Sequence, residues 1–439
     1  MLAAGSGIDK WWKIFNIHDE DAVRDILERH RIGNLKGYKP LPEVSNDAMW
    51  VNEPKRSPGL LVLNSRPFNA QSPEGVMDEF ITPNDLFFVR GHMPVPDLTN
   101  KPDFCVQVEG DGIISHCFTL DELRSRFQQH TVTTTMQCGG NRRKTMQSEF
   151  SHTGKGVKGL EWSSGGIGTA SWTGVWLREV LAACRQSEPE NKDTYHVQFE
   201  GADHDAAGHF QVSIPYKMAT HEDADVLLAY KMNGEDIPRD HGYPLRAIVP
   251  GVVGVRNCKF LQRVTVQPFE AQSVWQQNDY KNFPSWETKP DPSYPSVYYM
   301  PVQSCLTDAT YNPGEDSIDL KAYAYAGGGK AIQRVEVSFD GGETFERTAN
   351  LLPPPPSHAS PQVERSLPNE KAWAWRQVDA QTPVEDIKAT PVELEDGTKV
   401  YNTCIRAITT DNATQPKVGS YNFRGLLYNG YSCREVKVE

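Results

Sequence analysis

Hydrophobic and polar positions over residues 61–300 follow two spacings, one typical of helices and one typical of strands. Thr119 and Glu122 stand three residues apart ahead of an apolar run, a capping box that predicts the start of a helix. Residues 131–136 are rich in β-branched side chains and predict a strand. Residues 225–231 predict another strand, which enters a hairpin turn at an Asn-Gly pair.

A further apolar series in this region repeats at helical spacing and predicts a second helix. Its members are Trp172, Val175, Trp176 and Val180. Because helices and strands are mixed over residues 61–300, this part of the chain is expected to form an α+β domain.

The pattern changes to strands alone over residues 301–439. Alternating or continuous apolar runs are separated by turn signals, among them a tight Asp-Gly-Gly turn at 340–342. The prolines at 353–356 belong to a loop, since proline cannot pair inside a central strand. The spacing predicts an immunoglobulin-like β-sandwich of about 140 residues.

The start of the chain is organised differently. Acidic residues 19–21 precede a short apolar helical face that Gly33 ends. Periodicity is then lost and prolines gather, so residues 38–60 are interpreted as a linker.

Composition and charge restrict the classes of partner. Hydrophobic residues make up 38% of the chain and aromatic residues 10%, enough for packed cores and too many for a disordered protein. The 45 basic and 57 acidic residues give a net charge of −12, which argues against nucleic acid or an anionic membrane as partner. The longest uncharged apolar run, between Arg246 and Arg256, has nine residues and is too short to span a bilayer. An anionic ligand would therefore need a local concentration of basic residues.

The eight cysteines form no CxxC pair and have no histidine at zinc spacing. We expect reduced, mostly buried thiols in place of a disulfide or zinc framework. Cys138 is different, because it ends a strand and is followed by two glycines, Asn141, Arg142 and Arg143. Cationic neighbours favour a thiolate, which suits a nucleophile or a ligand for a soft metal. The alternative is a cysteine packed as a small hydrophobic residue beside a surface turn.

Basic side chains recur beside glycine-containing turns in residues 87–92, 239–246 and 252–259. Guanidinium and backbone N–H groups in such turns can capture phosphate or another oxyanion. Each segment alone could be a solvated loop, but three in one domain of an acidic protein indicate a polyvalent anionic cofactor. Tyr280, between two opposite charges, is a candidate proton donor or a packing residue.

Taken in order, these segments resemble the eukaryotic sulfite oxidases, a family of molybdenum-cofactor enzymes, over almost the whole chain. The motifs that carry the resemblance include QCGGNRR (137–143), PRDHGYP (238–244), VPGVVGVR (249–256), DYKNF (279–283), VSFDGGETF (337–345), KAWAWR (371–376) and NFRG (422–425).

The resemblance assigns roles to particular residues. Cys138 would be the protein thiolate on molybdenum. The residues implied around the substrate are Arg90, Arg143, Trp162, Tyr280 and Arg424. The residues implied to hold the molybdopterin are Phe88, Val89, Arg90, Gly91, His92, Asp203, His241, Arg246, Asn257, Cys258 and Lys259.

The resemblance further implies oxidation of sulfite to sulfate by oxygen-atom transfer, in a molybdopterin-binding domain at 61–300. A dimerisation domain at 301–439 would form a homodimer, and cytochrome c or oxygen would accept the electrons. The family's animal members imply the mitochondrial intermembrane space, or the cytosol if the chain starts at Met1. Residues 1–37 resemble part of a cytochrome b5-like haem domain. His18 matches one axial ligand and has no second histidine, so haem b is not expected.

Two alternatives stay open. The molybdenum domain of eukaryotic nitrate reductase resembles much of the same series, but Arg424 in NFRG favours the sulfite oxidases. A cofactor-free dimerisation scaffold is the other alternative.

Overall fold

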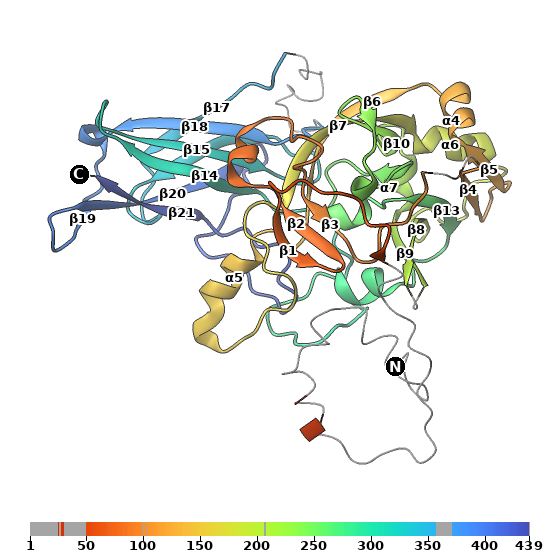
Figure 1. Cartoon of the computed structure of the whole chain (residues 1–439), viewed down its shortest axis with the longest axis horizontal. Coiled ribbons are helices and arrows are strands. Elements are labelled where there is room, and N and C mark those ends of the chain that lie inside the picture. Colours follow the sequence, from red (N-terminus) through yellow and green to blue (C-terminus); the bar gives the residue numbers. More distant parts are fainter. Residues whose placement is uncertain are drawn as a thin grey trace.

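The computed structural model describes residues 25, 28, 29, 50–99, 101, 103–205, 208–356 and 371–438. The proposed haem-domain remnant, with His18, lies outside these residues apart from 25, 28 and 29. The described chain forms two domains side by side, one of sheets with short helices and one of strands (Figure 1).

Three sheets build the first domain. The smallest contains β1 (Leu61–Ser65), β2 (Phe68–Gln71) and β3 (Val89–Arg90). A second contains β6 (His130–Gln137), β7 (Ile167–Trp176), β10 (Leu227–Met232), β11 (Glu235–Asp236) and β12 (Arg246–Ile248). The third contains β4 (Cys105–Gly110), β5 (His116–Thr119), β8 (His196–Asp205), β9 (Gly208–Pro215) and β13 (Leu261–Gln267).

Short helices connect and cover these sheets. The α-helices are α4 (Leu120–Arg126), α5 (Arg143–Phe150), α6 (Leu177–Cys184) and α7 (Tyr216–Thr220). The shorter 3-10 and π turns of this domain are η2 (Glu74–Asp78), η3 (Ser151–Thr153), η4 (Arg239–His241), η5 (Gly254–Arg256) and η6 (Trp275–Asp279). The capping box is confirmed at α4, where the Thr119 side chain accepts from the Glu122 amide and Glu122 reaches back. None of the described helices has the length and apolar character needed to cross a membrane.

The prediction of a helix through Trp172, Val175 and Trp176 is wrong. These residues belong to β7, and the helix α6 begins only at Leu177. β7 pairs with both β6 and β10 and is buried along almost its whole length. One of its faces carries the hydroxyls of residues 169, 171 and 173, which pair with threonines of β6, and the other carries both tryptophans. Trp172 and Trp176 stand on one face and Val175 on the other, so the spacing of these large apolar side chains imitates that of a helix.

The second domain is one eight-stranded sheet that curls into two facing layers, with β17 joining them. The strands are β14 (Gln303–Asn312), β15 (Ser317–Tyr325), β16 (Ile332–Ser338), β17 (Arg347–Leu351), β18 (Arg376–Pro383), β19 (Val392–Glu393), β20 (Lys399–Thr409) and β21 (Ser432–Val438), with one turn, η7 (Val384–Asp386). Apolar residues from both layers, such as Leu306, Val337 and Ile405, share one core. The predicted all-strand character of this part is confirmed.

The expectation that all cysteines are reduced is wrong. Disulfides join Cys105 to Cys117 and Cys404 to Cys433, while the remaining four cysteines are free and buried. Cys404 and Cys433 lie directly opposite each other on β20 and β21. Sequence spacing does not show such a pair, because its members meet only when two antiparallel strands align.

The second domain also contacts the edge of the sheet that leads into Cys138. The backbone N–H of Thr135 in β6 donates to the Trp373 carbonyl at 2.9 Å, and the Trp375 N–H donates to the Thr135 hydroxyl at 2.7 Å. The strand that precedes the candidate metal ligand is therefore bordered by residues of the other domain.

Candidate functional site

Cys138 lies where β6 ends, and its side chain is only 6% exposed. Its N–H donates to the Gly166 carbonyl at 2.8 Å, which fixes the turn that follows. A Cβ at Gly140 would collide with the Arg143 guanidinium, so this glycine lets Arg143 fold back over the turn. Gly140 thus stands beside the cysteine for a steric reason.

A pocket of about 670 Å³, counting its open mouth, contains Cys138. The predicted residues that line it are Phe88, Arg90, His92, Cys138, Asp203, His241, Arg246, Asn257, Lys259 and Tyr280. The lining residues that the sequence-based selection missed are Phe87, Met136, Gly139, Phe210, Asp240, Gly254 and Val255. The three basic segments and the cysteine turn, far apart in sequence, therefore meet at one cavity.

One part of the pocket is a dense group of buried charges. Arg246 donates to the His241 carbonyl at 2.6 Å and to the Asn257 carbonyl at 3.0 Å. Lys259 Nζ donates to the Asp240 carbonyl at 2.9 Å. Burial lowers the pKa of Arg246 to about 9 and that of Lys259 to about 8, the latter against the attraction of Asp240 and Asp203. An anionic ligand would stabilise both cations.

Burial also favours the uncharged forms of His241 and Asp203. Burial lowers the pKa of His241 to about 4, and its ring nitrogen lies 2.8 Å from the Asn84 carbonyl. Burial raises the pKa of Asp203 to about 7, although Lys259 opposes this shift. Asp203 Oδ1 and Arg246 Nε have no hydrogen-bond partner in the described chain. Buried polar atoms of this kind need a partner, which a pterin with its phosphate can supply, so the residues present fit a molybdopterin.

Cations also gather near Cys138. Arg90 Nη1 donates to Asn69 Oδ1 at 3.0 Å, and Arg424 pairs with Asp279 at 3.1 Å. Arg143 donates to the Leu160 carbonyl at 2.8 Å. Burial lowers the pKa of its guanidinium, and the attraction of Cys138 opposes this shift. The side chains of Arg90, Arg143 and Arg424 are thus fixed from three different segments.

Trp162 and Arg424 have unpaired buried nitrogens as well. Trp162 Nε1 and Arg424 Nε lack a hydrogen-bond partner among the described residues. Trp162 is fully buried and packs edge-on to Phe88, with ring centres 6.2 Å apart. Arg143, Trp162 and Arg424 are not among the residues that line the cavity.

Tyr280 reaches the pocket from the segment after η6 and contacts His92. The His92 ring nitrogen lies 3.3 Å from the Tyr280 hydroxyl, and the imidazole stacks on Phe210. Burial lowers the pKa of His92 well below its ordinary value, and the charge of Arg90 lowers it further. A neutral imidazole can accept the phenol proton in this hydrogen bond.

Three predicted pocket residues do not present side chains to the cavity. Val89 packs with Leu60 and Ala70, and Gly91 has no side chain. Cys258 is fully buried with its thiol against the Lys259 carbonyl, and burial raises its pKa well above the ordinary value. Asp240, which was not selected, is the aspartate of the PRDH segment, and its carboxylate pairs with Arg56, 184 positions away, at 2.8 Å.

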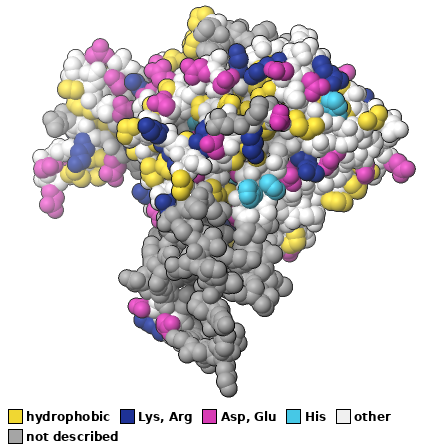
Figure 2. Space-filling model, turned by 45° about the vertical axis from the view of Figure 1, so that its right-hand side comes forward, with side chains coloured by type: hydrophobic (Ala, Val, Ile, Leu, Met, Phe, Trp, Pro, Cys, Tyr) yellow, Lys and Arg dark blue, Asp and Glu magenta, His cyan; other side chains and the backbone are white. Residues whose placement is uncertain are grey.

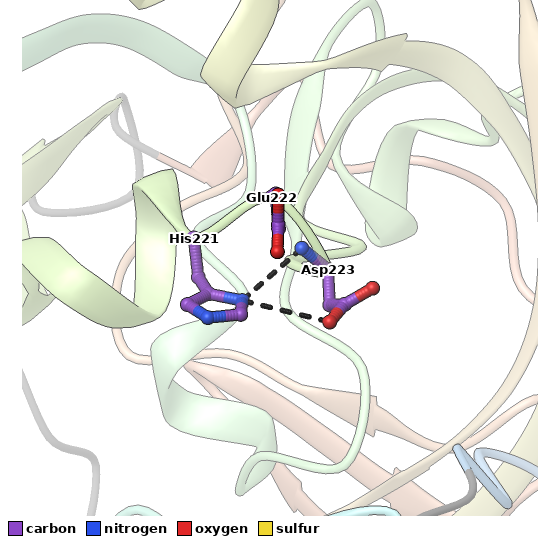
Figure 3. A group of neighbouring side chains, drawn as sticks. All are labelled: His221, Glu222 and Asp223. Carbon is purple, nitrogen blue, oxygen red and sulfur yellow. Dashed lines mark hydrogen bonds and ion pairs between the residues drawn. The ribbon is translucent and has the colours of Figure 1, made fainter.

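A second group of possible metal ligands lies on the surface after α7. His221, Glu222 and Asp223 are all exposed, and the His221 ring accepts from the Asp223 N–H at 3.1 Å (Figure 3). This bond is internal to the turn, so the group has the character of a solvated surface turn. The outer surface elsewhere mixes Lys and Arg with Asp and Glu side chains (Figure 2). In this view, the acidic residues behind the negative net charge do not gather on one face.

The chain matches two protein families, one over each domain. Residues 92–275 match "Oxidoreductase molybdopterin binding domain" and residues 295–439 match "Mo-co oxidoreductase dimerisation domain". The chain is also 40% identical, over 97% of its length, to "Sulfite oxidase" from Gallus gallus, of which it covers 88%. It belongs to the sulfite oxidase family.

Other members of the sulfite oxidase family show the same relation. "Sulfite oxidase, mitochondrial" from Homo sapiens is 40% identical over 98% of this chain, which covers 75% of it. "Sulfite oxidase" from Arabidopsis thaliana is 34% identical over 76% of this chain, which covers 86% of it. "Nitrate reductase [NADH] 1" from Phaseolus vulgaris is 32% identical, and the chain covers only 46% of its length.

The fold is also that of a solved relative. The structure of "the Sulfane Dehydrogenase SoxCD from Paracoccus pantotrophus" superposes with a TM-score of 0.61 at 21% identity, covering 92% of this chain and 93% of that one. The predictions of an α+β molybdopterin-binding domain and a dimerisation domain are therefore confirmed. Membership of the sulfite oxidase family makes the chain a molybdenum-dependent oxidoreductase with a molybdopterin cofactor.

Proposed function

We propose that this chain oxidises sulfite to sulfate at a molybdenum–pterin centre held by Cys138. The observation that carries the proposal is one pocket with a cysteine thiol and a buried group of cations. A thiolate is the ligand that a soft metal prefers, and the cations suit a phosphorylated pterin and an oxyanion substrate. When bound, the molybdenum–pterin group supplies oxygen-atom transfer and takes up two electrons.

The basic and polar part of the pocket would hold the pterin and its phosphate. Arg246 and Lys259 provide the positive charge, and the unpaired Asp203 Oδ1 provides an acceptor for a pterin N–H. His241 and Asn257 complete this part of the lining. Residues 88–92 would contact the cofactor from the strand β3 and the residues on either side of it.

The cations near Cys138 would bind sulfite. Arg90 lines the cavity, and Arg143 lies near enough to interact with the charges of Cys138, Arg90 and Arg424, so a dianion beside Cys138 would meet several positive charges. Sulfate carries the same charge as sulfite, and the arginines stabilise charge that moves onto oxygen in the transition state. Tyr280 would orient the anion through its hydroxyl, with Trp162 closing the wall behind Phe88.

The overall reaction requires an electron acceptor. Sulfite and water give sulfate, two protons and two electrons, and the electrons leave one at a time. We infer that cytochrome c accepts them, because an acidic protein suits a basic partner. The dimerisation domain supports a homodimer, with residues 61–300 as catalytic domain and residues 301–439 as dimerisation domain.

The disulfides bear on the location of the protein. Relatives carry the name mitochondrial, and disulfides persist where thiols are not kept reduced. Two disulfides support the intermembrane space over the reducing matrix and the cytosol. The test is the redox state of Cys105 and Cys404 in mitochondria fractionated under alkylating conditions.

The activity is tested by steady-state assays of the full-length, molybdenum-loaded protein with sulfite and with nitrate. Sulfite-dependent reduction of cytochrome c is expected, with little nitrate reduction. Nitrate turnover without sulfite oxidation would overturn the proposal. A protein that binds no molybdenum when made in a cofactor-competent host would instead favour a cofactor-free scaffold.

A further inference from the structure

The second domain contacts the turn that carries Cys138 at several points. The Gly139 carbonyl accepts from the Leu427 N–H at 2.9 Å. The Arg143 Nε donates to the carbonyls of Arg424 at 3.1 Å and Gly425 at 3.2 Å. These bonds fix both ends of the turn from one C-terminal segment.

Arg142 adds a second connection between the domains. It is a buried residue with a left-handed backbone (φ 62°), and its guanidinium donates to the carbonyls of Gly430 at 2.6 Å and Tyr431 at 2.7 Å. The guanidinium also lies over the Tyr428 ring, 5.1 Å from its centre. The domain named for dimerisation therefore supports the metal-ligand turn directly.

Tyr323 makes the contact that leads most directly to the cysteine. This fully buried residue of β15 donates its hydroxyl hydrogen to the Ser164 carbonyl at 3.0 Å and accepts from Asn141 Nδ2 at 3.3 Å. Asn141 Oδ1 accepts from the Gly166 N–H at 2.9 Å, and the Gly166 carbonyl accepts from the Cys138 N–H at 2.8 Å. One chain of hydrogen bonds thus runs from the second domain to the backbone of Cys138.

The surroundings leave this chain little freedom. A Cβ at Gly166 would lie 3.0 Å from Asn141 Oδ1 and 3.1 Å from the Trp162 ring. Trp375 packs against the Tyr323 ring, with ring centres 5.5 Å apart. Burial raises the pKa of the Tyr323 phenol well above its ordinary value, so the hydroxyl stays protonated and donates to the Ser164 carbonyl.

We propose that Tyr323 is a positioning residue, whose hydroxyl joins the segments at Asn141 and Ser164 and thereby fixes the Cys138 turn. Without the hydroxyl, Asn141 Nδ2 would be a buried donor with no partner, and the turn would open more often. The inference rests on the proposed function only in making Cys138 the metal ligand. The geometric role itself is measurable without turnover.

The same strand offers a matched control. Tyr325 lies two residues along β15, on the same face and equally buried. Its hydroxyl contacts the Thr135 carbonyl at 3.4 Å, inside β6 and before the cysteine turn. Tyr325→Phe removes a buried hydroxyl from the same strand without touching the chain of bonds that ends at Cys138.

The first experiment compares Tyr323→Phe, Tyr325→Phe and the unchanged full-length protein by hydrogen exchange of the molybdenum-loaded form. Amides of residues 138–143 and 163–166 should exchange about tenfold faster in Tyr323→Phe, as loss of one buried hydrogen bond predicts. Tyr325→Phe should leave them unchanged. Unaltered exchange in Tyr323→Phe, or equal acceleration in both variants, would overturn the proposal.

The second experiment separates this inference from the proposed function. In cofactor-free full-length protein, alkylation of Cys138 by iodoacetamide should be about tenfold faster in Tyr323→Phe, with Cys184 unchanged as an internal reference. This result stands even if Cys138 binds no metal. Equal alkylation rates in all three proteins would contradict it.

A third variant keeps the proposal testable if Tyr323→Phe folds poorly. Asn141→Ala removes the same hydrogen bond from the other side, and in that background Tyr323→Phe should add little further exchange. Independent, additive effects of the two substitutions would count against a shared bond. In loaded enzyme, Tyr323→Phe should lower kcat more than it raises the KM for sulfite.

Discussion

At Cys138 a single turn performs two tasks, since it presents a thiol to the pocket and returns the chain into α5. Gly140 allows the return, because only a residue without a side chain leaves room for the Arg143 guanidinium. A thiol that is 6% exposed and opens on a cavity is placed for a ligand and shielded from bulk solvent.

Replacing the thiol should therefore abolish the activity without unfolding the protein. Cys138→Ser exchanges a soft ligand for a weak one, and sulfite oxidation is expected to fall by at least about a thousandfold. Cytochrome c reduction and molybdenum content measure the effect. Cys184→Ser, a buried cysteine on α6, is the control and should keep its activity. Normal turnover by Cys138→Ser would exclude a thiolate ligand.

Of the arginines implied around the substrate, Arg90 is the one that lines the cavity, and its loss should weaken sulfite binding most. Arg90→Gln removes one positive charge, so the KM for sulfite should rise about ten- to a hundredfold. Steady-state kinetics across sulfite concentrations measures the change. Arg263→Gln removes an exposed arginine paired with Glu109 and should leave the KM unaltered. An unchanged KM in Arg90→Gln would remove Arg90 from the substrate site.

The low pKa of His241 makes stability depend on pH. The folded-state value is about 4 against an ordinary 6.5, so between these values the unfolded chain binds a proton that the native state does not. The native state should then lose stability as the pH falls from 6.5 toward 4. The loss from this residue between pH 7.5 and pH 5 is about 2 kcal/mol.

Denaturant unfolding of cofactor-free protein at the two pH values measures this effect. Glutamine does not titrate. Between pH 7.5 and pH 5 the free energy of unfolding of His241→Gln should therefore fall by about 2 kcal/mol less than that of the unchanged chain. Asp203 acts in the opposite direction, because its pKa is raised to about 7, and the comparison cancels its contribution. Equal pH slopes for both proteins would show that His241 is not buried as a neutral ring.

At the scale of elements, the disulfides fasten two strand pairs. Cys105–Cys117 closes 12 residues between β4 and β5, and Cys404–Cys433 closes 29 residues between β20 and β21. The second lies two residues beyond Tyr431, whose carbonyl accepts from Arg142. A covalent link thus stands close to the contact between the second domain and the Cys138 turn.

Removing the longer disulfide should destabilise the protein. Cys404→Ser with Cys433→Ser is expected to lower the free energy of unfolding by about 3 kcal/mol, since the unfolded chain regains loop entropy. Denaturant titration measures this, and Cys305→Ser serves as a control at a free cysteine. Thiol counting on the unreduced, denatured cofactor-free chain should give four free thiols of eight. Eight would contradict both disulfides.

At the scale of the whole molecule, the net charge of −12 matters for partners. If cytochrome c is the acceptor, its reduction should slow several-fold between about 10 mM and 200 mM salt, because screening weakens long-range attraction. Reduction of a small neutral acceptor is the control and should change little. Salt-independent reduction of cytochrome c would argue against electrostatic docking.

The sequence by itself determined the local chemistry of this protein. The capping box at Thr119, the strand before Cys138 and the basic segments were readable because cap, strand and turn preferences depend on neighbouring residues. Ten of the predicted site residues line the pocket. Basic residues beside turns pointed to an anion site, but the full set was selected through the resemblance to the sulfite oxidases.

The tertiary structure decided the rest. Sequence spacing misassigned Trp172 and Val175, because large apolar side chains stand on both buried faces of β7 and match helical spacing. It missed the disulfides and the pairing of Asp240 with Arg56, since both depend on which distant segments pack together. The support of Cys138 by Tyr323 is of the same kind. Residues 182 positions apart (Asn141 and Tyr323) are brought into contact only when the two domains pack, and no local pattern encodes that distance.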